Sequence, residues 1–67
     1  METEQNNLTV IRLAITTGRK AAELFIETGE FKSPYDCATV PVSQQSLFNQ
    51  AWYRAYDPMI ATAERNH

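Results

Sequence analysis

Apolar and small residues between Leu8 and Phe25 recur with the period of a helix that buries one face. Spacings of three and four residues alternate along the series Leu8, Ile11, Ile15, Gly18, Ala22 and Phe25. This rhythm is typical of a helix that packs one seam against a neighbour. We therefore expect a helix from about Asn7 to Thr28, ended by Gly29 in the left-handed conformation.

Small side chains add a second pattern inside this predicted helix, because Ala14, Gly18 and Ala22 follow one another at intervals of four residues. A glycine inside a helix costs about 1 kcal/mol relative to alanine, so Gly18 indicates close approach of another helix. That contact lies either within the chain or across a dimer; the alternative is a kink near residues 16–18. With a contact, Gly18→Leu should destabilise the protein. Gly18→Ala should be near neutral, because its gain in helix propensity offsets the added methyl group.

Residues 29–43 form a connector that is long for a link between two helices. Inside it, the run from Ser33 to Asp36 predicts a one-turn helix, with Ser33 as the cap and Pro34 at the first helical position. Residues 39–42 should be extended, because Pro41 disfavours the helical conformation of the residue before it.

A second long helix is predicted to begin at Ser43, with Val42 and Leu47 in contact as a hydrophobic staple. Its apolar face is formed by Leu47, Phe48, Ala51, Trp52, Ala55, Tyr56 and Met59. Pro58 interrupts the pattern. It either kinks one longer helix or, with Asp57 as the cap, starts a short third helix at the C-terminus.

These elements predict an all-α fold for the whole chain, residues 1–67, as a single small domain with residues 1–6 frayed. The fold consists of two main antiparallel helices joined by the long connector. A chain of this size buries only about 60% of its unfolded surface, so a lone core is marginally stable. Because Cys37 is the single cysteine, no internal disulfide can help. We therefore expect a homo-oligomer.

The formal net charge is −2, with six basic and eight acidic residues. Nucleic-acid binding depends on clustered Lys and Arg, so this balance disfavours it. The N-terminus has no basic region, and no apolar run reaches the length of a membrane span or a signal sequence. The sequence therefore predicts a cytoplasmic protein without a membrane partner.

No catalytic template is complete in this sequence. Cys37 and the terminal His67 are the only residues of their types, and no Gly-rich phosphate loop is present. A zinc site would need these two residues together with carboxylates, which matches no known structural pattern. We expect no enzyme activity, no cofactor and no metal site.

Six residues are candidates for binding a partner: Arg12, Arg19, Lys20, Trp52, Tyr53 and Arg54. The three basic residues of the first helix form either a small basic patch or an ordinary solvated face. The aromatic residues either anchor a partner protein, as exposed aromatics do at interfaces, or fill the core. Trp52 and Tyr56 fit the core better, with Tyr53 at its edge.

Short motifs resemble the layout of the ribosome modulation factor family. They are Gly18-Arg19 with nearby alanines, Ser33-Pro34-Tyr35, Gln45, and residues 51–55, Ala-Trp-Tyr-Arg-Ala. The resemblance implies two helices, a long connector and binding to ribosomal RNA. Ser33 stands where the family has cysteine, Ala51 stands where it has glycine, and this chain is acidic where the family is strongly basic. In size and composition the chain is similar to small accessory proteins of temperate phages.

Two functions follow from these observations. The first is a small non-enzymatic protein that binds another protein, as a homodimer or larger assembly, in a regulatory or phage-accessory role on a host factor. The alternative is a ribosome- or nucleic-acid-associated factor that uses Arg12, Arg19, Lys20 and Arg54.

Overall fold

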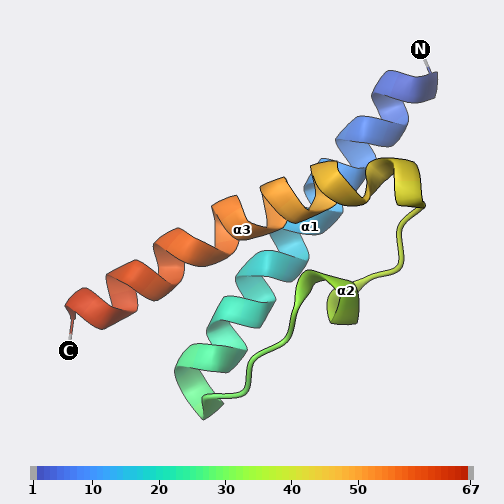
Figure 1. Ribbon diagram of the computed structural model, residues 1–67. Helices are drawn as coiled ribbons and strands as arrows, with labels where there is room; N and C mark the ends of the chain where they lie inside the picture. The colour runs from blue at the N-terminus through green and yellow to red at the C-terminus, as the bar shows by residue number, and fades with distance from the viewer. Residues whose placement is uncertain (1, 67) are drawn as a thin grey trace.

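The computed structural model describes the backbone of residues 2–66 and the side chains of residues 7–66. Three helices, α1 (Glu2–Thr28), α2 (Pro34–Cys37) and α3 (Val42–Arg65), account for the regular structure of these residues, without a strand (Figure 1). The two long helices pack against each other, and α2 lies in the connector between them. Over the described residues, no helix is long and apolar enough to cross a membrane.

Helix α1 begins at Glu2, so the backbone of residues 2–6, where fraying was expected, is helical. Its end agrees with the prediction. Gly29 has a φ of 79°, and its backbone N–H donates to the carbonyl oxygen of Phe25 at 2.8 Å. Glycine adopts this left-handed conformation without the steric cost that other residues bear, and it turns the chain into the connector.

The predicted one-turn helix in the connector is confirmed as α2. Ser33 precedes it in an extended conformation, and Pro34 occupies its first turn and is buried. One carboxylate oxygen of Asp36, Oδ2, accepts hydrogen bonds from the backbone N–H and from the hydroxyl of Ser33, each at 3.2 Å. These bonds satisfy polar groups at the helix start and fix the turn. Pro41 is extended at φ −58° and ψ 149°, directly before α3.

Helix α3 begins at Val42, one residue before the predicted start, with Pro41 in the capping position. The predicted staple is wrong, because the Val42 side chain is 84% exposed and cannot be packed on Leu47. The helix continues through Pro58 to Arg65. The short helix therefore lies in the connector, and none begins at Pro58.

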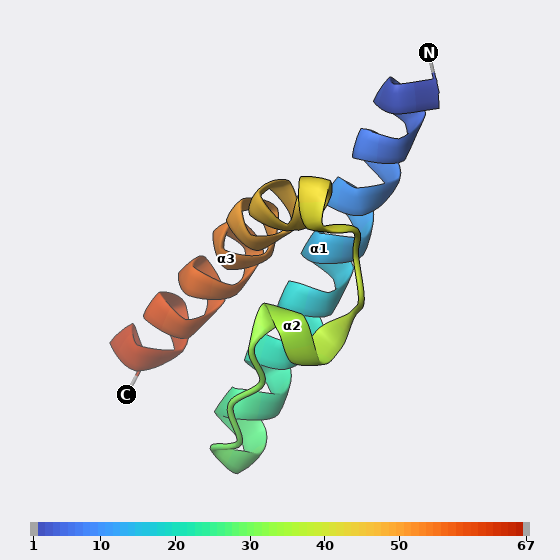
Figure 2. The same cartoon turned by 45° about the vertical axis from the view of Figure 1, so that its right-hand side comes forward.

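The long helices run in the same general direction. The side-chain amide of Gln44, near the start of α3, donates to Asn7 Oδ1 near the start of the described side chains of α1, at 3.4 Å. Further along both helices, Gly18 lies against Trp52 and Ala55. Because these contacts ascend together in both helices, they do not fit the expected antiparallel arrangement. Figures 1 and 2 agree, since both helices descend from the end that carries the N-terminus.

The connector explains this direction. An extended chain advances about 3.3 Å per residue and a helix about 1.5 Å, so residues 29–41 are long enough to travel back along most of α1. They do so in both views, passing α2 on the way and delivering the chain to the start of α3 (Figures 1 and 2). The length of the connector is thus what allows α3 to begin near the start of α1 and to run in the same direction.

The core is built where small residues of α1 meet large residues of α3. Its buried members are Val10, Ala14, Ala21, Ala22, Phe48, Trp52 and Tyr56. Gly18 is also buried, and a Cβ atom at this position would lie only 2.6 Å from the carbonyl oxygen of Trp52. Such a distance is shorter than van der Waals contact, so the absence of a side chain at Gly18 is what lets the two backbones meet.

The buried stripe of α1 is rotated relative to the seam drawn from the sequence. Ala14 and Ala22 are fully buried, but Leu8 is 55% exposed and Phe25 is 37% exposed. Val10 and Ala21 lie in the core instead. The small residues of the predicted seam, Ala14, Gly18 and Ala22, are therefore buried as expected, whereas the large residues at its two ends are exposed.

The contact at Gly18 revises the near-neutral outcome expected for Gly18→Ala. The methyl group meets backbone, which does not move aside as a flexible side chain does. Overpacking costs about 1–3 kcal/mol and the gain in propensity is about 1 kcal/mol, so we expect Gly18→Ala to lose up to about 2 kcal/mol and Gly18→Leu to lose more. Urea unfolding checks this, with Thr16→Ala at an exposed site of α1 as the control. A Gly18→Ala protein more stable than the parent, or a Gly18→Leu protein as stable as the parent, would contradict it.

Replacing Pro58 should stabilise the protein, in contrast to the changes at Gly18. It is exposed inside α3, where its ring removes the hydrogen bond to the carbonyl of Arg54, four residues earlier. We expect Pro58→Ala to stabilise the protein by up to about 3 kcal/mol, because no buried contact is lost. Thermal unfolding followed by circular dichroism should show a raised midpoint. An unchanged or lowered midpoint would mean that Pro58 is matched to a bend that α3 needs.

Candidate functional site

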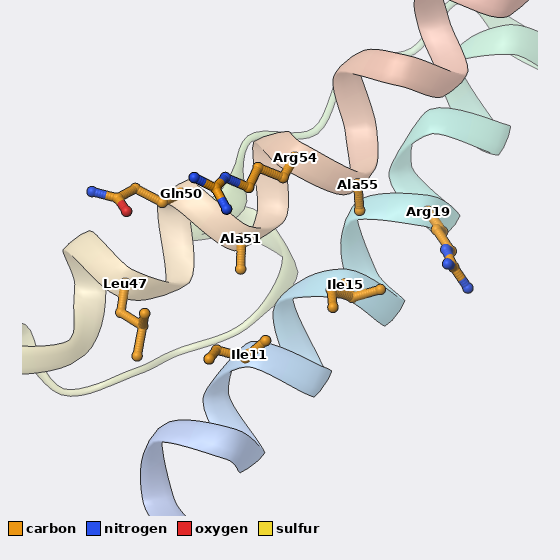
Figure 3. A pocket seen from close by; sticks show the side chains of 8 residues that line it. All are labelled: Ile11, Ile15, Arg19, Leu47, Gln50, Ala51, Arg54 and Ala55. Atoms are coloured by element: carbon orange, nitrogen blue, oxygen red, sulfur yellow. The ribbon is translucent and has the colours of Figure 1, made fainter. Parts of the chain in front are cut away.

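A groove of about 360 Å³ runs between α1 and α3 on one side of their crossing. Eight residues line it: Ile11, Ile15, Arg19, Leu47, Gln50, Ala51, Arg54 and Ala55. In Figure 3, Leu47 and Ala51 on α3 point toward Ile11 and Ile15 on α1. The apolar side chains of the two helices therefore face each other across the groove floor.

Helical spacing produces this floor. Ile11 and Ile15 are four residues apart, so they stack one above the other on α1. On α3, Leu47, Ala51 and Ala55 follow the same rule. The two alanines fill little space, which leaves the floor hollow. Ile11 and Ile15 are only half-buried and lie outside the buried core, so their apolar surface is available to another molecule.

The margin of the groove is polar and positive. Arg54 extends along α3 toward Gln50, and Arg19 projects outward from α1 (Figure 3). No carboxylate is among the described residues that line the groove. The acidic residues whose side chains are described lie outside the lining of the groove, although the chain as a whole carries a net charge of −2. This site combines an apolar floor with two guanidinium groups, and such groups pair well with carboxylates.

The other basic candidates are placed differently. Arg12 is exposed on α1, seven residues and thus about two turns before Arg19. Lys20 lies away from the groove, in a second hollow that it shares with Lys32 of the connector and with Asp36 and Cys37 of α2. The structure therefore places Arg19 and Arg54 at the margin of the same groove and Lys20 outside it.

The aromatic candidates belong mainly to the core. Trp52 has no exposed surface, and its ring is stacked on Tyr56 with centroids 4.7 Å apart. Tyr53 packs edge-on against Trp52 at 4.8 Å and remains 40% exposed. Phe31 of the connector closes the cluster with an edge-on contact to Tyr56. Of these residues, Trp52 is not accessible to a partner, whereas Tyr53 is.

Burial raises the pKa of the Tyr56 hydroxyl above its ordinary value of 10.0, and the nearby Asp57 carboxylate and Tyr53 add to the shift. Removing the phenolic proton would place a negative charge in an apolar surrounding that already faces an acid. Burial thus favours the protonated form of the hydroxyl, and the ring of Tyr56 packs in the core.

The groove is the feature that the sequence pattern did not reveal. Leu47, Ala51 and Ala55 had been expected on the buried face of the second helix, and Gln50 had not been considered. The positions of these residues relative to Ile11 and Ile15 depend on the relative direction of the two helices. The sequence contained one sign of the groove. Ile11 and Ile15 are large apolar residues beside a contact that requires small ones.

The comparisons give no match to a family model, to a curated protein or to a solved structure. No group of three or more His, Cys, Asp or Glu side chains that could hold a metal ion occurs among the described residues. The resemblance to the ribosome modulation factor family thus stays a prediction from short motifs. Any function has to be argued from the groove itself.

The raised pKa of Tyr56 leads to a prediction at alkaline pH. In the unfolded chain the hydroxyl ionises near pH 10.0, while the folded protein resists ionisation. The unfolded state therefore releases this proton first, and the free energy of unfolding should fall as the pH rises from about 10 through the folded pKa. Tyr56→Phe keeps the ring and should flatten this part of the curve. Urea unfolding of both proteins between pH 8 and 11 tests it. Equal slopes would place the effect on another tyrosine.

Proposed function

We propose that this chain is a small non-enzymatic protein that acts in the cytoplasm by binding another protein chain, with the groove between α1 and α3 as the binding surface. The observation that carries the proposal is the groove's composition, five apolar residues on the floor and two arginines at the margin. An amphipathic helix presents the matching pattern, an apolar stripe with charged residues beside it. Size and composition similar to those of small phage accessory proteins fit a regulatory role.

The chemistry of the floor favours protein over nucleic acid. Ile11, Ile15 and Leu47 can bury apolar side chains of a partner, and each Å² of apolar surface removed from water contributes about 25 cal/mol. A phosphate backbone has no apolar surface to bury on this floor. Strong nucleic-acid binding also uses about 6–10 phosphate contacts, whereas this groove supplies two cations.

The ribosome- or nucleic-acid-associated alternative is supported by one feature, the absence of a carboxylate beside Arg19 and Arg54 in the groove. Exposed Arg12 adds a further cation on α1. This alternative makes a separate demand, because binding that releases counterions weakens steeply as salt is raised. Salt dependence therefore separates the two functions.

We expect the tagged protein to capture a protein from bacterial lysate at both about 50 and about 200 mM salt, with or without nuclease treatment. Ile15→Asp should abolish this capture, because it places a charge on the groove floor. Leu13→Asp is the matched control, since Leu13 is a 39% exposed apolar residue of α1 outside the groove. Circular dichroism of both variants establishes that the fold persists.

Two results would contradict the proposal. Capture that disappears with nuclease or between the two salt concentrations would favour the nucleic-acid alternative. Capture that survives Ile15→Asp as well as Leu13→Asp would show that the bound protein uses another surface.

A further inference from the structure

The groove floor is part of a longer apolar stripe on α1. Leu8, Ile15 and Ile26 are separated by seven and eleven residues, close to two and three helical turns, so they share one face. Ile15 lines the groove, while Leu8 is 55% exposed and Ile26 is 47% exposed. Figures 1 and 2 show the C-terminal part of α3 diverging from the C-terminal part of α1. The stripe therefore continues past the groove, with about half of the surface of Leu8 and of Ile26 exposed.

Charge is divided along the same helix. Arg12 and Arg19 lie in the first two thirds of α1, and both are exposed. Glu23, Glu27 and Glu30 follow at its end and in the first connector residues, and all three are exposed as well. Helix α1 is thus basic beside Ile15 and acidic beside Ile26.

This division is complementary to itself in one orientation only. If two copies of α1 lay side by side in the same direction, arginine would face arginine and glutamate would face glutamate. In the antiparallel orientation, placing Ile15 of one copy opposite Ile26 of the other brings Arg19 beside Glu23. The same register brings Arg12 between Glu27 and Glu30. A two-fold axis repeats each of these contacts and keeps both charged margins on the same side of the pair.

We propose that a second copy of this chain occupies the groove, with its α1 antiparallel to the first and Ile26 of each copy on the groove floor of the other. Arg54, on the α3 side of the groove, adds to the positive margin that receives the acidic end of the second copy. The proposal rests on the proposed function in one respect, that the groove binds protein. A different protein that displaces the second copy must carry a similar stripe, apolar residues beside carboxylates.

Dimerisation would also supply stability that a core of this size lacks. A single core of 67 residues without a disulfide is marginally stable, and association commonly supplies the remainder. The exposed leucine and isoleucines of α1 would otherwise stay in water.

Charge reversal tests the arrangement in both directions. We expect sedimentation equilibrium to show a dimer for the parent chain at micromolar concentration. The variants Arg12→Glu/Arg19→Glu and Glu23→Lys/Glu27→Lys should each dimerise about tenfold more weakly or worse, because the pairs of Arg19 with Glu23 and of Arg12 with Glu27 become repulsions. An equimolar mixture of the two variants should recover a heterodimer. The chain with all four substitutions, whose net charge equals that of the parent, should dimerise alone, which excludes a simple effect of net charge.

A second pair of variants tests the stripe without changing the arginines or glutamates. Ile26→Asp should give a monomer, and Leu13→Asp, at a comparably exposed apolar residue of α1 off the stripe, should remain a dimer. Circular dichroism shows whether each monomer keeps its helices. A dimer that survives Ile26→Asp, or whose two charge variants do not recover on mixing, would overturn the arrangement.

The two proposals can fail separately. A parent chain that is monomeric throughout the micromolar range, yet captures a protein through Ile15, overturns the second-copy arrangement and supports the proposed function. A dimer that dissociates with Ile26→Asp, from a chain that captures no other protein, supports the arrangement and overturns the proposed function.

Discussion

The structure depends on one contact, the approach of the α3 backbone to Gly18. The Trp52 carbonyl lies where a side chain at position 18 would begin. This approach lets α3 press its largest residues onto the surface of α1, where Ala14 and Ala22 make room for them. Phe48 and Trp52 are consequently almost fully buried in a chain of only 67 residues. The helix propensity lost at Gly18, about 1 kcal/mol, is small beside the burial of two such aromatic side chains.

The same contact sets the position of the groove. With the helices joined at Gly18 and running in the same direction, Ile11 and Ile15 come to face the residues of α3 that precede and follow Trp52. Alanines on α3 then leave an open floor between them. The core itself is not ideal, because the indole N–H of Trp52 is buried without a hydrogen-bond partner among the described residues. A buried unpaired donor costs about 1–3 kcal/mol, which leaves this small core with less stability to spare.

Local sequence signals predicted local structure well. The end of α1 at Gly29, the one-turn helix after Ser33 and the importance of a small residue at Gly18 each follow from constraints within a few residues. The direction of α3 does not, because hydrophobic periodicity is the same whichever way a helix runs. The prediction of a contact between Val42 and Leu47 was wrong for a related reason. A hydrophobic staple forms only if the chain enters the helix at a suitable angle, and here the returning connector sets that angle. The groove depends on this direction too, so its α3 residues could not be assigned to it from periodicity alone.

Net charge proved a coarse guide to the surface. A value of −2 averages over the whole chain, and it disfavours a uniformly basic surface such as one that tracks a phosphate backbone. It hides the order of the charges, since Arg19 and Arg54 line the groove and Glu23 and Glu27 follow Arg19 along α1. Glu23 lies about one helical turn from Arg19, within the screening length of about 8 Å at physiological salt, so a partner in the groove meets both signs of charge on α1. Since the apolar floor lies between those arginines, a partner must satisfy both chemistries within one short segment, and an amphipathic helix with carboxylates beside its apolar stripe does so.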